Sequence, residues 1–518
     1  MARGNDMRRF TKILFSRLGI TAVLVLFELA LVLTIMLRLS AYSVYFFILL
    51  IFNHVASLIA VVNGEGNPEY KLTWMGVIVL IPFLGTALYA MFGKSKMSKR
   101  EIRRLVGVRA KMKECTSPSD ALDSLGKEDR LASGKAMAIL NIDKSSGVYS
   151  RTVSKYYGEG KQMFTDMLAD IESAEEYIFL EYFIIERGVM WDGIYSRLKE
   201  KAQAGVDVRV MYDDVGCMST LPKRFRDELE MAGIQCLCFS RVSADLRNMR
   251  RNNNRDHRKL CIVDGRVAYT GGVNIADEYI GEREKYGVWK DGGVRLSGDG
   301  ALGFTRLFLE LWLLSGGSDV NTEEYLKSDY TLSGDGGYYL PFGSGPYPMY
   351  TSQSGKRAIL DIVNQAERYV YLMTPYLIID YDLSEALLGA AYRGVDVRII
   401  TPGIPDKKMV NVMTKSSYSY LINGGVAIYE YTPGFLHAKA IVSDDEYAVL
   451  GTINLDYRSL VHHFEDAVWM YCSPAIRDVR EDCLETMQKS ERIGRKNAKL
   501  GLKERIVRCG IRLFAPLL

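Results

Sequence analysis

The chain has few histidines, no regular cysteine spacing and little net charge. The cysteine spacing and the low net charge each argue against a class of function. Only five of the 518 residues are histidine. The eight cysteines have no disulfide-framework spacing and no second Cys or His pair at zinc-like spacing, so we expect reduced thiols and no metal site. The formal net charge is only +4, and no basic and aromatic groove pattern is present, which disfavours a nucleic-acid partner.

Two matched copies of one pattern, H-x-K-x4-D followed by Gly-x-x-Asn, begin 180 residues apart. The members are His257, Lys259, Asp264 and Asn274 in the first copy, and His437, Lys439, Asp444 and Asn454 in the second. The remaining histidines, His54, His462 and His463, fall outside this repeat and are interpreted as structural residues. The duplication indicates one active site assembled from two similar halves.

The residue types of the repeated pattern suit the cleavage of a phosphodiester. Neutral imidazole attacks phosphorus, and a second, protonated imidazole donates a proton to the departing alkoxide, so one histidine per copy suffices. On a strand, a lysine two residues later points to the same face as its histidine and holds the non-bridging oxygens. The asparagine amides donate further hydrogen bonds to these oxygens as negative charge develops. The histidines, lysines and aspartates form the candidate catalytic set, and the chemistry requires no metal.

Repeats upstream of the two motifs predict an α/β fold. Residues 174–178 and 366–370 are similar segments that lead into apolar runs, and residues 205–209 and 394–398 are the identical pentapeptide Gly-Val-Asp-Val-Arg. Each segment follows a helical stretch and opens a predicted strand. We therefore expect two α/β lobes that form a pseudo-dimer with pseudo-two-fold symmetry within one chain.

The composition divides the chain further. Residues 316–349 are rich in Gly, Ser, Tyr and Asp, which predicts a linker with surface loops. The apolar residues of 301–314 recur at helical spacing, which favours a core helix over a lipid-contacting one. The predicted division is a membrane anchor over 1–93, a basic juxtamembrane linker over 94–150, a first lobe over 151–315, a linker over 316–349, a second lobe over 350–475 and a basic C-terminal helix over 476–518.

Long uncharged segments near the amino terminus predict transmembrane helices. Residues 39–62 and 72–93 contain no Asp, Glu, Lys or Arg, and each exceeds the ~20 apolar residues needed to cross a bilayer. A third segment, 19–37, contains Glu28 and leaves two or three crossings open. The basic run that starts at Lys94 places the lobes in the cytoplasm by the positive-inside rule. We expect a multi-pass protein of the cell membrane.

The duplicated H-x-K-x4-D pattern resembles that of the phospholipase D superfamily, in which two half-sites share one phosphate at a pseudo-two-fold axis. The resemblance implies a carboxylate behind each histidine that fixes its tautomer. Glu465, 28 residues after His437, and Asp291, 34 residues after His257, are the candidates. In such folds the aspartates of the two motifs have a structural role.

Within that superfamily, the chain is similar to the bacterial cardiolipin synthases. The residues that carry this similarity are Asn-Pro-Glu-Tyr-Lys-Leu-Thr-Trp at 67–74, the segments 81–85 and 89–93, and Asn-Arg-Asp-His-Arg-Lys at 254–259. The resemblance implies transfer of a phosphatidyl group from one phosphatidylglycerol to another, giving cardiolipin and glycerol through a covalent phosphatidyl-histidine, without a cofactor. Phosphatidylglycerol and other anionic phospholipids are then the expected partners.

The sequence leaves the division of roles and three other functions open. We take His257 as the nucleophile and His437 as the acid and base, although two-fold symmetry permits the reverse. A hydrolytic phospholipase D would keep every catalytic residue and use water as the acceptor. A membrane-tethered nuclease of the same superfamily and a noncatalytic lipid-binding scaffold are the remaining alternatives.

Overall fold

A computed structural model of the chain describes residues 30, 34, 43–64, 67–93, 99–114, 120–241, 254–318, 320–327 and 333–495. The chain divides into two compact units. One unit contains residues 1–94 and 512–518, and the other contains residues 95–511. All six cysteines of the described part are free thiols.

The described part of the first unit is a set of helices, namely α3 (Ser43–Val62), α4 (Pro68–Leu80) and α5 (Pro82–Phe92). The Asn67 side chain accepts a hydrogen bond from the Glu69 backbone N–H at 2.8 Å and so caps the start of α4. A small core holds the helices together and consists of Val61, Trp74, Val77 and Ile78.

The structure does not support the predicted transmembrane helices. Residues 72–93 do not form one helix, because the chain leaves helical geometry at Ile81, with φ −136° and ψ 83°. The following Pro82 disfavours the helical conformation in the residue before it. Within the part of the chain that the structure describes, no helix has both the length and the apolar character to cross a membrane. Segment 19–37 lies outside the described residues except for positions 30 and 34.

The first lobe contains a seven-stranded sheet with the strand order β1-β8-β6-β5-β2-β3-β4. Strands β2, β3 and β4 are parallel, and the other neighbours pair antiparallel. The strands are β1 (Thr152–Tyr157), β2 (Tyr177–Tyr182), β3 (Asp207–Asp213), β4 (Gln235–Phe239), β5 (Lys259–Val263), β6 (Val267–Gly271) and β8 (Gly293–Gly298). The helices of this lobe are α9 (Gly160–Ser173), α10 (Val189–Gln203), α11 (Asp214–Cys217) and α12 (Phe225–Met231).

The second lobe contains an eight-stranded sheet with the strand order β17-β12-β11-β10-β14-β15-β16-β9. Its strands are β9 (Tyr338–Ser344), β10 (Tyr369–Met373), β11 (Asp396–Pro402), β12 (Ala427–Tyr431), β14 (Ala440–Ser443), β15 (Tyr447–Gly451), β16 (Glu465–Tyr471) and β17 (Ser490–Arg492). Its helices are α15 (Ser354–Gln365), α16 (Tyr381–Tyr392) and α17 (Lys408–Asn423).

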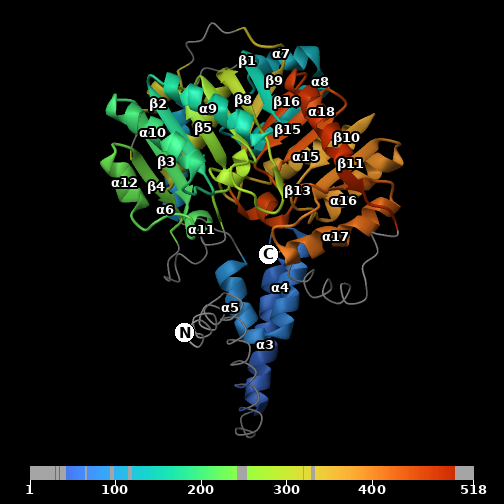
Figure 1. Cartoon of the computed structure of the whole chain (residues 1–518). Helices are drawn as coiled ribbons and strands as arrows, with labels where there is room; N and C mark the ends of the chain where they lie inside the picture. The colour runs from blue at the N-terminus through green and yellow to red at the C-terminus, as the bar shows by residue number, and fades with distance from the viewer. Residues whose placement is uncertain are drawn as a thin grey trace, which may run out of the picture. The chain divides into compact units, whose positions relative to one another are not determined.

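The two lobes repeat one topology, which confirms the prediction of two α/β lobes. The order β8-β6-β5-β2-β3-β4 in the first lobe corresponds to β16-β15-β14-β10-β11-β12 in the second. The repeated Gly-Val-Asp-Val-Arg segments open β3 and β11, as predicted. Figure 1 shows the sheets side by side, with α10 and α12 beside the first and α16 and α17 beside the second.

A hydrophobic core shared by the lobes joins one face of each sheet. It contains apolar residues of β2, β5 and β8 from the first lobe and of β10, β14 and β16 from the second. The helix between the lobes, α13 (Asp299–Leu314), contributes to this core, and all of its residues are buried. The prediction of a core helix over 301–314 is therefore confirmed, and lipid contact by this segment is excluded.

Three segments differ from their sequence-based interpretation. Residues 94–150, predicted as a linker, contain α6 (Lys99–Glu114), α7 (Ala121–Glu128) and α8 (Arg130–Ile142), and α6 buries Leu105, Val108 and Met112 in the shared core. The predicted linker 316–349 contains the short helix α14 (Thr322–Tyr325) and the buried edge strand β9, which pairs with β16. The predicted C-terminal helix is only α18 (Ala475–Gln488) before β17, and residues after 495 lie outside the described part.

Candidate active site

The backbone of the opposite lobe holds each motif histidine at the interface between the lobes. The backbone N–H of His257 donates to the carbonyl of Phe464 at 2.8 Å, and that of His437 donates to the carbonyl of Lys290 at 2.7 Å. Strands β7 (Val288–Lys290) and β13 (Gly434–Leu436) pair in parallel across this interface. The two histidines are therefore positioned by equivalent contacts, one from each lobe.

Each histidine takes its carboxylate partner from the other lobe. Nδ1 of His257 lies 2.9 Å from Oε2 of Glu465, and Nδ1 of His437 lies 2.6 Å from Oδ2 of Asp291. Both predicted carboxylates thus contact a histidine. Counting along each repeat places Glu465 with His437 and Asp291 with His257, so the structure exchanges the partners. Neither lobe contains a complete half-site on its own.

The two motif lysines are almost fully buried beside their histidines. Lys259 is 1% exposed and Lys439 is 5% exposed. Nζ of Lys259 donates to the carbonyl of His257 at 2.6 Å, and Lys439 makes the equivalent contact with His437. Burial lowers the pKa of Lys259 to about 8 and that of Lys439 to about 7, although neighbouring carboxylates partly oppose this shift.

Burial also keeps both histidines neutral near pH 7. Desolvation and the charge of Lys259 lower the pKa of His257 well below its usual value. Desolvation and Lys439 lower the pKa of His437 to about 4, while Asp291 acts in the opposite direction. With Nδ1–H donated to a carboxylate, Nε2 of a neutral imidazole carries the lone pair needed for attack or proton transfer.

The two carboxylates differ in charge. Burial alone would raise the pKa of Asp291, but His437 and Lys439 outweigh it and lower that pKa below its usual value. Burial raises the pKa of Glu465 well above its usual value. Glu465 also accepts hydrogen bonds from the hydroxyls of Thr452 and Ser459. Asp291 is therefore an anion beside His437, whereas burial favours the neutral form of Glu465 beside His257.

The motif aspartates, placed in the candidate catalytic set, instead organise turns remote from the histidines. Asp264 accepts hydrogen bonds from the backbone N–H groups of residues 175, 176 and 177 at 2.8, 2.8 and 2.7 Å. Asp444 accepts three equivalent bonds from residues 367, 368 and 369, each at 2.9 Å. A strand rise of roughly 3.3 Å per residue places each aspartate about 16 Å along the strand from its lysine. These contacts fit the structural role that the family resemblance implies for both aspartates.

The two motif asparagines differ from each other. The Asn274 amide is engaged within its own lobe, because Oδ1 accepts from the Ile184 backbone N–H at 3.1 Å and Nδ2 donates to the Tyr279 hydroxyl at 2.8 Å. The Tyr279 ring packs against His437 with a centroid distance of 5.6 Å. Asn274 therefore positions an aromatic wall of the site. Oδ1 of Asn454 is buried and has no hydrogen-bond partner among the described residues.

The glycines of the Gly-x-x-Asn repeat allow two strands to approach closely. A Cβ at Gly271 would lie 2.4 Å from the carbonyl oxygen of Gly292. A Cβ at Gly451 would lie 2.3 Å from the carbonyl oxygen of Asp466. Both contacts are too short for any side chain. The glycines therefore allow β6 to lie next to β8, which follows Asp291, and β15 to lie next to β16, which begins at Glu465.

Sequence reasoning missed two aromatic residues of the site. His463, interpreted as structural, packs beside His257 with a ring centroid distance of 5.7 Å. Trp289 packs beside His437 at the same distance of 5.7 Å. Each residue stands two positions before a carboxylate: His463 precedes Glu465, and Trp289 precedes Asp291. That shared spacing was the available signal, but it acquires meaning only once the carboxylates are placed.

The charges around the site suit an anion better than a cation. Ring nitrogens of His257 and His463 and a carboxylate oxygen of Glu465 lie within 4.8 Å of one another, a spacing compatible with a metal ion. However, His257 is already hydrogen-bonded to Glu465. The ammonium groups of Lys259 and Lys439 both act electrostatically on His257. These buried ammonium groups would oppose a divalent cation and attract a phosphodiester.

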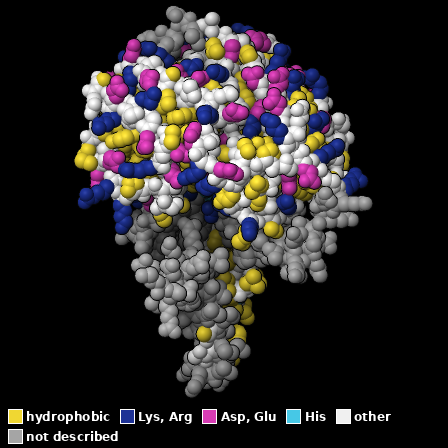
Figure 2. Space-filling view, viewed as in Figure 1, with side chains coloured by type: hydrophobic (Ala, Val, Ile, Leu, Met, Phe, Trp, Pro, Cys, Tyr) yellow, Lys and Arg dark blue, Asp and Glu magenta, His cyan; other side chains and the backbone are white. Residues whose placement is uncertain are grey.

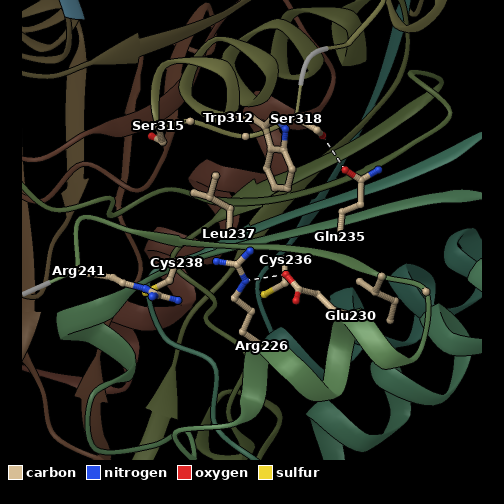
Figure 3. A pocket seen from close by; sticks show the side chains of 14 residues that line it. Arg226, Glu230, Gln235, Cys236, Leu237, Cys238, Arg241, Trp312, Ser315 and Ser318 are labelled. Atoms are coloured by element: carbon tan, nitrogen blue, oxygen red, sulfur yellow. Dashed lines mark hydrogen bonds and ion pairs between the residues drawn. The ribbon is translucent and has the colours of Figure 1, made fainter.

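A separate pocket of about 580 Å³ lies at the outer edge of β4. Figure 3 shows Arg226 paired with Glu230 among the lining residues, and Gln235 bonded to Ser318 near the ring of Trp312. None of the predicted site residues lines this pocket. It is distinct from the histidine site.

Comparison with known proteins agrees with this geometry. Residues 167–290 and 359–486 match the family model described as cardiolipin synthase, PLD-like domain, and residues 54–94 match the phospholipase D-nuclease N-terminal model. Cardiolipin synthase 1 of Bacillus cereus is 30% identical over 96% of this chain and 99% of that protein. An uncharacterized protein of Streptococcus mutans is 39% identical over 90% of this chain and all of that protein.

The fold also resembles a solved enzyme structure. The crystal structure of phosphatidylserine synthase from Haemophilus influenzae superposes with a TM-score of 0.56 at 14% identity, covering 75% of this chain and 98% of that one. Two repeated lobes around paired histidine and lysine residues define an enzyme of the phospholipase D superfamily. Within it, the chain belongs to the cardiolipin synthase family and is a phosphatidyltransferase.

Proposed function

We propose that this enzyme transfers a phosphatidyl group from one phosphatidylglycerol to a hydroxyl of a second, forming cardiolipin and releasing glycerol. The observation that carries the proposal is the paired site, in which each lobe supplies a histidine, a lysine and the carboxylate for the opposite histidine. One phosphodiester replaces another of similar energy, so no nucleotide is consumed. Membership of the cardiolipin synthase family supports the same reaction.

In the first half-reaction, Nε2 of His257 attacks the phosphorus of the donor lipid, and the bond from phosphorus to the glycerol oxygen breaks. His437 donates a proton to that oxygen, so glycerol leaves as a neutral alcohol. The bound phosphodiester anion and Asp291 both favour protonation of His437. The ammonium groups of Lys259 and Lys439 stabilise the charge that develops on the non-bridging oxygens.

In the second half-reaction, the hydroxyl of another phosphatidylglycerol attacks the phosphatidyl-histidine. His437, now neutral, accepts the hydroxyl proton while the new phosphorus–oxygen bond forms and the phosphorus–nitrogen bond to His257 breaks. His257 returns to its neutral form, and the proton count of the site is restored. The covalent intermediate retains the donor's bond energy between the two steps.

The difference between the carboxylates supports this division of roles. A nucleophile works as neutral imidazole, and burial raises the pKa of Glu465, which disfavours an anion that would stabilise the imidazolium form of His257. An acid must exist transiently as imidazolium, and the lowered pKa of Asp291 places an anion beside His437. We therefore assign the nucleophile to His257 and the acid and base role to His437.

We further propose that the first unit attaches the enzyme to a phospholipid membrane. Helix α3 exposes a long series of large apolar side chains, among them Ile48 at 59%, Ile51 at 60% and Phe52 at 70%. Such a surface binds a bilayer interface by burying apolar area. Replacing Ile48 and Phe52 with aspartate should reduce co-flotation of the full chain with phosphatidylglycerol vesicles.

The lipid products decide between transfer and hydrolysis. Purified enzyme is incubated with phosphatidylglycerol bilayers and a chelator, and the products are identified by mass spectrometry. Cardiolipin with equimolar glycerol is the expected result. Phosphatidic acid without cardiolipin would identify water as the acceptor and reject the synthase assignment. On the face that Figure 2 shows, basic and acidic side chains are interspersed and form no basic patch of the kind that a nuclease would use.

A further inference from the structure

Two aromatic residues occupy equivalent positions beside the catalytic histidines. His463 precedes Glu465 by two residues, and Trp289 precedes Asp291 by two residues. The ring of His463 lies 5.7 Å from that of His257, and the ring of Trp289 lies 5.7 Å from that of His437. The pseudo-two-fold symmetry of the site therefore includes this second pair of rings.

Both rings carry buried nitrogen atoms that make no hydrogen bond to a described residue, and the nearest charged partner of His463 is Oε1 of Glu465, 3.8 Å from its Nδ1. Nδ1 and Nε2 of His463 and Nε1 of Trp289 are buried and have no hydrogen-bond partner within the described ranges. His463 as a whole is only 9% exposed. Buried polar groups in folded proteins are nearly always paired, and an unpaired donor costs free energy until a ligand satisfies it. Two such donors at symmetric positions indicate a ligand-binding role.

The chemistry of the site identifies that ligand. Burial and the positive charges of Arg458, Arg255 and Lys259 keep His463 neutral by lowering its pKa well below its usual value. A neutral imidazole has one N–H to donate, and an indole has only a donor. The non-bridging oxygens of a phosphodiester only accept hydrogen bonds. The Asn274 amide, predicted to supply such a donor, already holds Tyr279.

We propose that His463 and Trp289 are substrate-binding residues, one beside each catalytic histidine, that donate hydrogen bonds to oxygens of the bound phosphodiester. The proposal rests on the proposed function, since it concerns the same site. Ring nitrogens of His463 and His257 lie within 4.8 Å of each other, so a phosphate attached to or approaching His257 is near the imidazole of His463. The Trp289 indole then contacts the phosphodiester from the side of His437.

The test uses inorganic phosphate as a probe that requires no lipid turnover. Phosphate affinity of the full chain is measured from the rise in unfolding midpoint with phosphate concentration and from competitive inhibition of phosphatidylglycerol turnover. His463→Leu and Trp289→Phe should each weaken phosphate binding about tenfold, as expected for loss of a hydrogen bond to a charged group. His463→Asn retains a side-chain N–H and should recover part of the affinity.

The neighbouring His462 provides the matched control. His462→Asn should bind phosphate like the wild type, because His462 does not occupy the position two residues before the carboxylate that His463 and Trp289 share. Each variant is also melted without phosphate, so that a loss of fold is separated from a loss of binding. Wild-type phosphate affinity in folded His463→Leu and Trp289→Phe would overturn the proposal.

This experiment is independent of the lipid product. A wild-type enzyme that binds phosphate through these residues but forms no cardiolipin would reject the proposed function and leave the binding assignment intact. Cardiolipin formation with unchanged kcat and KM in both variants would support the proposed function and reject the binding role of His463 and Trp289. A selective rise in KM for one variant would assign that side chain to substrate binding before chemistry.

Discussion

The two halves of the active site have the same backbone frame but different electrostatics. In both halves a histidine receives its carboxylate from the other lobe, and a lysine two residues later contacts the histidine carbonyl. The carboxylate of one half is Asp291, whose pKa is lowered, and that of the other is Glu465, whose pKa is raised. The repeated lobes supply the symmetric frame, and the different environments of the two carboxylates are the basis of the proposed division of roles.

The exchange of carboxylates makes the lobes mutually dependent. Because each histidine is oriented by the opposite lobe, a small relative movement of the lobes would disturb both half-sites at once. The pairing of β7 with β13 and the shared core around α13 resist that movement. Rigid packing between the lobes is therefore part of the catalytic apparatus.

Replacing either histidine tests the difference between the halves most strongly. His257→Ala and His437→Ala should each lower phosphatidyl transfer by about 10³-fold or more, because each removes a group that participates in bond breaking. Rapid-quench trapping of labelled phosphatidylglycerol should give a covalent adduct on residue 257 in wild type. The adduct should be absent from the His257 variant. A trapped adduct on residue 437 would reverse the assigned roles.

The carboxylates should give the next largest effect and an unequal one. Asp291→Asn removes the anion that stabilises the His437 imidazolium, so kcat should fall by about 10² or more. Glu465→Gln keeps a neutral hydrogen-bonding partner for His257, so its loss should be about tenfold smaller. Steady-state kinetics on phosphatidylglycerol vesicles provide both values. Equal losses in the two variants would show that the carboxylates do not distinguish the halves.

Sequence patterns specified the lobes and the chemical groups of the site, and long-range packing determined the rest. The repeated Gly-Val-Asp-Val-Arg segments and the two motifs are local signals, and they predicted the repeated lobes and the family correctly. The motif aspartates, in contrast, lie at turns and not beside the histidines. The exchange of Glu465 and Asp291 depends on which strands meet across the interface, which local spacing does not encode. Strand β9 was missed because its glycine-rich surroundings resemble a loop, although pairing with β16 buries it.

The N-terminal unit shows the opposite limit of sequence patterns. Charge-free length predicted one helix over 72–93, but a single proline determines the geometry at Ile81 and divides the segment.

Similarly, His463 was excluded because it lies outside the repeat along the chain, yet folding places it beside His257. Position relative to a motif is a poor guide when the site is assembled from two lobes.

The lysines should make substrate binding sensitive to pH in a range where most lysines are fully charged. Burial lowers the pKa of Lys439 to about 7 and that of Lys259 to about 8. Raising the pH through 7 to 8 therefore removes positive charge from the free enzyme, and kcat/KM should fall by up to about tenfold per pH unit between the two pKa values and by up to about a hundredfold per pH unit above both. The bound anion favours protonated lysine, so the decline in kcat should occur at higher pH.

An arginine variant separates the lysine contribution from other titrations. Arginine stays charged across this range, so Lys439→Arg should shift the decline in kcat/KM to higher pH, even though its bulk lowers the maximum rate. Lys259→Arg should instead shift only the decline that occurs near pH 8, which belongs to Lys259. Comparing the two variants therefore distinguishes the two halves of the site. Profiles identical to wild type in both variants would assign the pH dependence to other groups.

Replacing the turn aspartates, Asp264 and Asp444, should have the smallest effect on activity. The effects of the two replacements should also be the most similar between the lobes. Asp264→Asn and Asp444→Asn each weaken three backbone hydrogen bonds at a strand start. Each variant should lose about 1–3 kcal/mol in the free energy of unfolding while keeping most of its kcat at temperatures where it is folded. Urea unfolding and activity are measured together, with the exposed Glu175→Gln as control. A kcat loss comparable with that of the histidine variants, without a loss of stability, would return these aspartates to the catalytic set.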